Sequence, residues 1–134
     1  HESDGKIVEI SAGLDVGLKR IGVALAFDKI VMPQNAVIRK NRNQAAREIS
    51  EILQQNGVKK LVVGIPLGGS NEDEMKRRIT HFCSLLNFKG EIIFMDESYS
   101  SIEADEMRQF SGKKKDGKLD SLAAMVILKR YLGA

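Results

Sequence analysis

The chain contains little of several residue types that mark other classes of protein. It has one cysteine, two prolines, two tyrosines and no tryptophan. Because Cys83 alone cannot form an internal disulfide, a disulfide-stapled secreted domain is excluded, and we expect a reducing, cytoplasmic setting. No apolar run approaches the roughly 18 residues that a membrane helix needs. The polar residues 1–6 lack the apolar stretch of a signal peptide, and we expect a flexible N-terminal extension or an expression remnant there.

What the chain does contain is an ordinary globular composition. Of its 134 residues, 43% are hydrophobic and 29% are charged, which predicts one folded domain over residues 7–134. The net charge of +3 is compatible with a nucleic-acid partner but does not require one. Basic residues cluster at 39–42, 76–78 and 113–118, and such clusters are most often solvated loops and helix faces.

Hydrophobic periodicity predicts an α/β domain. Three strands come first, in an antiparallel meander, with Met32 and Pro33 at a turn or a sheet edge. Helices and strands then alternate, and two helices close the chain. The predicted strands cover residues 7–14, 21–27, 35–39, 60–65 and 91–95, and the predicted helices cover 43–56, a segment starting after Asn71, about 100–109 and 119–132. This order predicts a mixed five-stranded sheet with helices packed on its faces, the arrangement of the ribonuclease-H-like fold.

Three acidic positions stand where an acid needs an explanation. Asp15 lies between two glycines at the end of the first apolar strand, where a carboxylate is costly unless it is hydrogen-bonded, paired or bound to a metal. Asp96 and Glu97 end the last strand, and Asp120 opens the last helix. Taken singly, each has a structural explanation, a turn cap for Asp15 and the preference of acids for helix starts for the others.

Taken together, the three positions predict a metal site. We expect carboxylates from the first strand, the last strand and the last helix to converge on one end of the sheet. Such a cluster repels itself unless cations neutralise it, and Mg²⁺ and Mn²⁺ prefer oxygen ligands. Two such ions about 4 Å apart activate water and stabilise the leaving oxygen in phosphodiester hydrolysis. No cysteine–histidine spacing suggests zinc, and Ser98, Ser100 and Ser101 lack an evident His/Asp arrangement for nucleophilic chemistry.

Four motifs follow one another along the chain. They are GLDVGLKRIGVA at residues 13–24, VVGIPL at 62–67, the acidic segment DES at 96–98 with SIEA at 101–104, and KLDSLAA at 118–124. In this order they resemble the motifs of the YqgF/RuvX family, bacterial nucleases that are similar to Holliday junction resolvases. The resemblance covers essentially residues 10–132. Any one motif alone is weak, whereas four in the same order are specific.

The resemblance implies a ribonuclease-H-like endonuclease that hydrolyses phosphodiester bonds, either in processing the 5′ end of pre-16S ribosomal RNA or in branched DNA. It implies that Asp15, Glu97 and Asp120 are catalytic and hold one or two Mg²⁺ or Mn²⁺ ions, with the choice between Asp96 and Glu97 left open. We expect a monomer or a homodimer and no membrane partner. The natural phosphate contacts are the basic residues near the motifs, Lys19, Arg20, Lys113, Lys114, Lys115 and Lys118.

The sequence departs from the family pattern at three positions. Ser98 stands where an arginine is common, which removes a bidentate phosphate or carboxylate partner. Val16 and Leu18 replace a usual aromatic residue and a usual threonine. Two other functions remain open: a non-catalytic nucleic-acid-binding protein on the same fold, and a nucleotide-binding module of the actin or sugar-kinase type. The second needs another related domain and a second phosphate loop, for which this chain has no room.

Overall fold

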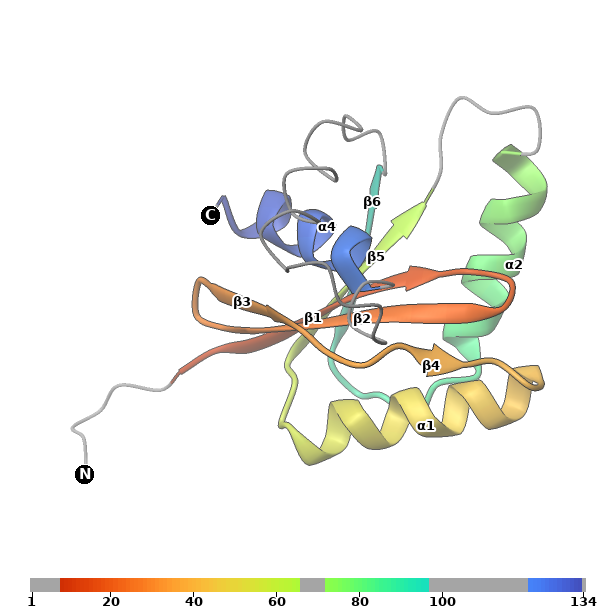
Figure 1. The fold of residues 1–134 in the computed structure, drawn as a ribbon, viewed down its shortest axis with the longest axis horizontal. Coiled ribbons are helices and arrows are strands. Elements are labelled where there is room, and N and C mark those ends of the chain that lie inside the picture. The colour runs from red at the N-terminus through yellow and green to blue at the C-terminus, as the bar shows by residue number, and fades with distance from the viewer. Residues whose placement is uncertain (1–7, 66–71, 97–120, 134) are drawn as a thin grey trace.

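The computed structural model describes residues 8–65, 72–96 and 121–133. In this part the chain forms one mixed sheet in the order β3-β2-β1-β5-β6, with β4 also paired to β2 (Figure 1). β2 runs antiparallel to β1, β3 and β4, whereas β1, β5 and β6 are parallel. The strands are β1 (Ile10–Val16), β2 (Arg20–Phe27), β3 (Ile30–Pro33), β4 (Val37–Ile38), β5 (Lys60–Ile65) and β6 (Glu91–Asp96), and the helices are α1 (Arg42–Gln55), α2 (Glu72–Ser84) and α4 (Leu122–Leu132).

The predicted element order is confirmed within the described residues, and the bounds of some elements differ. β5 covers the predicted residues 60–65, and α1 lies within one residue of its prediction. β1 starts later than predicted and continues to Val16, because Asp15 and Val16 extend the antiparallel ladder with β2. The predicted helix near residues 100–109 lies outside the described residues, as do residues 119 and 120 of the last predicted helix.

The predicted third strand has the wrong bounds. Sequence reasoning placed it at residues 35–39, whereas the structure has two short pieces, β3 and β4, along the same edge of β2. The chain reverses before β3 at Asp28, whose φ of 58° lies in the left-handed region that Asp adopts more readily than most residues. Pro33 ends β3 at the sheet edge, where proline is tolerated. The six strands therefore occupy five positions across the sheet, as predicted, with one position divided.

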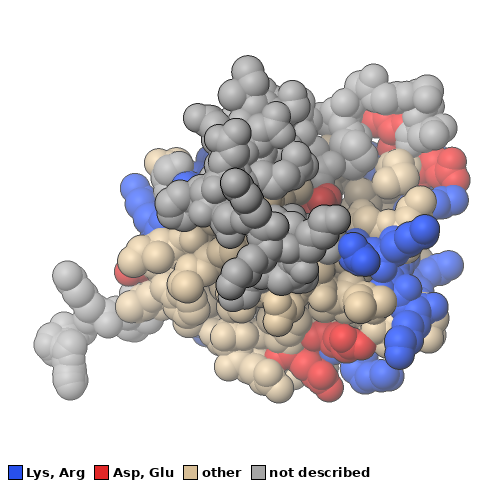
Figure 2. All heavy atoms as spheres, viewed as in Figure 1, with Lys and Arg blue, Asp and Glu red and all other residues tan. Residues whose placement is uncertain are grey.

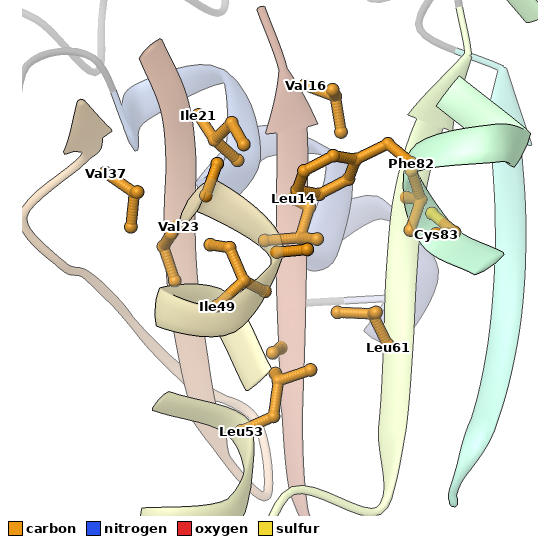
Figure 3. Packing of buried hydrophobic residues seen from close by; sticks show 14 of the residues in the cluster. Leu14, Val16, Ile21, Val23, Val37, Ile49, Leu53, Leu61, Phe82 and Cys83 are labelled. Atoms are coloured by element: carbon orange, nitrogen blue, oxygen red, sulfur yellow. The ribbon is translucent and has the colours of Figure 1, made fainter. Parts of the chain in front are cut away.

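The two faces of the sheet are covered by different helices (Figure 1). Under α1 and α2 lies a core of large side chains, and the ring of Phe82 reaches from α2 toward Leu14 and Val16 of β1 (Figure 3). On the opposite face, α4 packs on small residues of β2, Ala24 and Ala26. Because strand side chains alternate between faces, β2, β5 and β6 contribute to both cores.

The start of α1 and the end of α4 have recognisable caps. The Asn41 Oδ1 atom accepts a hydrogen bond from the backbone N–H of Gln44 at 2.7 Å, and the Gln44 side chain accepts one from the Asn41 N–H at 3.2 Å. This capping box fixes the start of α1. α4 ends at Gly133, whose φ of 71° is typical of a left-handed C-cap. None of the described helices combines the length and apolar character needed to span a membrane.

Candidate functional site

Asp15 lies near the carboxyl end of β1, opposite Gly22 of β2. It belongs to the same face of the sheet as Gly13, because side chains two residues apart in a strand point the same way, and Gly13 faces α4. The Asp15 side chain is half-buried. Among the described residues, none donates a hydrogen bond to its carboxylate or forms an ion pair with it. An acid therefore occupies an otherwise apolar strand with no described group to compensate its charge.

Gly13 lets α4 approach β1 closely, two residues before Asp15. A Cβ atom at position 13 would lie 2.7 Å from the carbonyl oxygen of Ala124 and 3.0 Å from the Cβ atom of Leu128. The first distance is shorter than any ordinary contact, so only glycine fits without a shift of the helix. The first turn of α4 thus lies against the strand that carries Asp15.

The carboxyl ends of three parallel strands meet at the edge of the sheet near Asp15. Leu14 pairs with Val63 of β5, and Ile65 at the end of β5 pairs with the backbone of Asp96 at the end of β6. β5 lies between β1 and β6, so the backbones of those two strands are roughly 10 Å apart at twice the usual strand spacing. In open sheets of parallel strands, ligands bind at this edge.

The start of α4 is fixed to the same region by Ser121. Its hydroxyl is buried and accepts a hydrogen bond from the backbone N–H of Val23 at 2.9 Å. The same hydroxyl donates to the carbonyl oxygen of Gln34 at 2.6 Å. Val23 pairs with Leu14, the residue before Asp15. The chain therefore enters α4 beside Val23, whose partner Leu14 directly precedes Asp15. This point lies at the gap between β3 and β4.

The structure describes only some of the predicted site residues. Asp15, Lys19 and Arg20 are described, and both basic residues are exposed at the tip of the β1–β2 hairpin. Asp96 is described by its backbone alone. Within the described ranges no three His, Cys, Asp or Glu side chains group in a way that could hold a metal ion. The remaining predicted residues lie outside those ranges, namely Glu97, Lys113, Lys114, Lys115, Lys118 and Asp120.

Sequence reasoning missed two residues that the structure brings forward. Ser121 appears in the sequence only as part of a motif, and the signal for it is a lone hydroxyl at the start of a highly apolar helix. Arg39 was assigned to a solvated cluster, whereas it is half-buried and donates from Nη1 to the carbonyl oxygen of Gly17 at 2.8 Å. Neither contact is local in sequence, so periodicity alone gives no sign of either.

Residues 9–134 match the RuvX family model, which is described as "Holliday junction resolvase". The chain belongs to the RuvX family. Among curated members it is 59% identical over 121 residues to a protein of Campylobacter lari, covering 90% of this chain and 94% of that one. A protein of Sulfurovum sp. is 55% identical, covering 90% and 96%, and one of Helicobacter pylori is 47% identical, covering 87% and 90%. Each is named "Putative pre-16S rRNA nuclease". The resemblance seen in the four motifs is confirmed, and this RuvX member belongs to a family of nucleases.

Solved structures confirm the ribonuclease-H-like architecture of this RuvX member. Thermus thermophilus RuvC, solved in complex with a Holliday junction substrate, matches with a TM-score of 0.62 at 13% identity, covering 92% of this chain and 94% of that one. The Fowlpox virus resolvase, solved with junction DNA, matches with a TM-score of 0.57 at 14% identity, covering 92% and 97%. At these identities the likeness is one of fold.

Proposed function

We propose that this chain is a metal-dependent endonuclease that hydrolyses phosphodiester bonds in precursor 16S ribosomal RNA. The observation that supports this most is Asp15, a half-buried carboxylate without a described partner, at the edge where three parallel strands end and α4 begins. An uncompensated carboxylate in such a place is costly unless a cation binds it. The name shared by the curated relatives supports the choice of substrate.

One or two Mg²⁺ or Mn²⁺ ions fit this chemistry. Asp15, Glu97 and Asp120 offer carboxylate oxygens, which are the ligands that hard divalent cations prefer. When bound, such an ion supplies an activated water nucleophile and stabilises charge on the leaving oxygen. Asp15 presents its carboxylate from a backbone held by ladders with β2 and by the contact of Gly13 with α4. Ser121 holds the start of the helix directly after Asp120.

The alternation of side chains along β6 favours Glu97 over Asp96 as the second acidic ligand. Ile93 and Met95 of β6 pack in the cluster beneath α4, and Glu97 follows Met95 by two residues in the sequence. Asp15 belongs to the α4 face of β1. Because Glu97 continues in sequence the series of β6 residues that face α4, we take it, with Asp15, as the pair that shares an ion.

The proposal is tested by cleavage of a labelled pre-16S RNA fragment in Mg²⁺ or Mn²⁺ by wild-type protein and the Asp15→Asn variant. We expect Asp15→Asn to lose more than about 100-fold in rate, beyond the usual effect of losing a group that only supports a metal ligand. Its melting temperature should hold or rise, because self-repulsion among the acids is relieved. Glu97→Gln should behave alike and Asp96→Asn should keep most activity.

The matched control is Asp28→Asn, which makes the same chemical change in the exposed turn before β3 and should cleave normally. Undiminished cleavage by Asp15→Asn contradicts the catalytic role of this acid. A melting temperature that falls strongly in the Asp15, Glu97 and Asp120 variants instead marks the acids as structural.

A second candidate is resolution of branched DNA, which the description of the matching family model favours. A four-way DNA junction assayed beside the RNA fragment separates the two, since the better substrate is cut faster by wild-type protein and by neither acid variant. Binding of both substrates without cleavage in either metal identifies a non-catalytic protein on this fold. The oligomeric state, monomer or homodimer, follows from sedimentation with and without the junction.

A further inference from the structure

Arg39 is held in a fixed position at the end of the sheet, just beyond the turn that follows Asp15. Its guanidinium lies over the ring of Phe82, with the Cζ atom 5.4 Å from the ring centroid. Its Nη1 atom donates to the carbonyl oxygen of Gly17 at 2.8 Å, and its backbone N–H donates to that of Lys19 at 2.9 Å. An arginine whose plane is stacked and hydrogen-bonded loses little entropy when it binds a further group.

Two more guanidinium groups lie close to Arg39. Burial first, and then the positive charges of Arg42 and Arg78, lower the pKa of Arg39 from its usual value. Arg42 is exposed in the first turn of α1, a turn without acidic residues. Arg78 forms an ion pair with Glu74 at 2.7 Å. This arginine cluster of Arg39, Arg42 and Arg78 therefore repels itself, and the described residues compensate it only at Arg78.

A hollow of about 380 Å³ opens beside the cluster, between the start of α1 and the end of α2. Its wall includes Arg42, the two asparagines at 41 and 43, and His81, beside the apolar Leu85. Figure 2 shows that most of the visible Lys and Arg side chains gather on this side of the molecule, over α2 and the tip of the β1–β2 hairpin. The surface therefore offers several donors to an anion in one place.

Arg20 and the turn after β1 connect the arginine cluster with the face that carries Asp15. Arg20 lies on β2 two residues from Gly22, the partner of Asp15, and so belongs to the same face. Gly17, which binds Arg39, is two residues beyond Asp15, roughly 7 Å along the strand. Over such a distance a duplex presents several phosphates, at one charge per about 1.7 Å. A polyanion that reaches Asp15 can therefore also reach the arginine cluster.

We propose that the arginine cluster binds the phosphate backbone of the nucleic-acid segment that flanks the scissile phosphate, on the side of α1 and α2. The inference rests on the proposed nuclease function and extends the substrate surface to the face opposite α4. Arg39 fixes the register of the backbone, while Arg42 and Arg78 add contacts that carry no sequence preference.

Equilibrium binding without metal tests the cluster separately from catalysis. The anisotropy of a labelled RNA duplex and of a labelled four-way DNA junction is measured with the full chain in EDTA over a range of NaCl concentrations. For Arg42→Gln we expect Kd to rise roughly 5-fold at low salt and the slope of log K against log[salt] to fall by about 0.9, one released counterion. Arg39→Gln should show the same, and Arg39→Lys an intermediate loss, because lysine keeps the charge without the planar fork.

The matched control is Lys89→Gln, which removes one exposed charge from the turn before β6, at the opposite edge of the sheet. Wild-type affinity and slope in both Arg42→Gln and Lys89→Gln overturn the proposal, and so does an equal loss in the two. Because the Arg42 side chain is exposed, the Arg42→Gln variant should stay folded, and its result stands even where Arg39→Gln unfolds. The two proposals fail separately. If the nuclease proposal is wrong, the protein cleaves neither substrate, while the binding values expected here are unchanged.

Discussion

The two faces of the sheet pack against their helices in different ways. The face beneath α1 and α2 is filled by large side chains, among them Phe82, Ile49 and Leu53. On the α4 face, β1 and β2 carry small residues where the helix crosses them, namely Gly13, Ala24 and Ala26, and at Gly13 the backbone of the helix itself approaches the strand. Bulk burial on the first face supplies apolar stabilisation. Close fit on the second face sets where α4 lies relative to Asp15, so this face shapes the surroundings of the candidate site.

The starts of the two helices differ in the same way. Asn41 is exposed and caps its own helix, α1, through the box that it forms with Gln44. Ser121 makes no side-chain cap to α4 and instead uses its hydroxyl to bind β2 and the segment after β3. The start of α1 is thus stabilised locally, whereas the start of α4 is positioned by the sheet.

The largest effect should come from removing bulk on the α1/α2 face. Phe82→Ala deletes a fully buried ring and should lower the free energy of unfolding by about 3–5 kcal/mol, through lost burial and the cavity left behind. Urea denaturation measures this. Leu85→Ala, a partly exposed neighbour on the same side of the fold, is the control and should cost far less. Equal losses in the two variants contradict the view that this face depends on bulk.

Adding a single methyl group should damage the α4 face. Gly13→Ala places a Cβ atom 2.7 Å from the carbonyl oxygen of Ala124, and the resulting shift should cost about 1–3 kcal/mol in the free energy of unfolding. Cleavage should fall at temperatures where the variant remains folded, because α4 moves relative to Asp15. A variant that retains wild-type stability and rate shows that the close fit is dispensable.

The smallest effects separate the two helix starts. Ser121→Ala leaves the buried N–H of Val23 without its partner and should cost about 1–3 kcal/mol. Asn41→Ala removes an exposed cap and should cost about 1 kcal/mol. Thermal unfolding compares their stabilities, and the RNA assay their rates. Only Ser121→Ala should also reduce cleavage, so a similar rate in both variants removes the distinction between a local cap and a positioned helix.

Much of the fold follows from patterns that are local in the sequence. The continuous apolar run of residues 60–65 predicts β5 because parallel strands are buried on both faces. The helical period of its apolar positions predicts α1. The division of the third strand was not predictable in this way, because the gap between β3 and β4 is filled by Ser121, which is 98 residues from its partner Val23.

For the candidate site, the sequence predicts which residue types take part, but it does not predict the contacts around them. An acid at the end of an apolar strand stands out in any sequence, so Asp15 could be named from physical cost alone. The role of Arg39 depends on a ring contributed by α2 and a carbonyl group contributed by the hairpin. Such contacts come from tertiary packing. A cluster of basic residues in the sequence does not show whether its side chains make such contacts or form a solvated face.

The hydrogen bond between Ser121 and Val23 also affects when the protein can finish folding during its synthesis. At about 5–20 residues per second, a ribosome needs roughly 5 to 20 s to add the 98 residues that separate the two partners. During that interval the nascent chain already carries Asp15 and the hairpin, while the surface meant for α4 has no helix on it. The acid is therefore synthesised well before the helix that covers its face of the sheet. In a newly synthesised molecule, the surroundings of Asp15 are therefore complete only once α4 has docked.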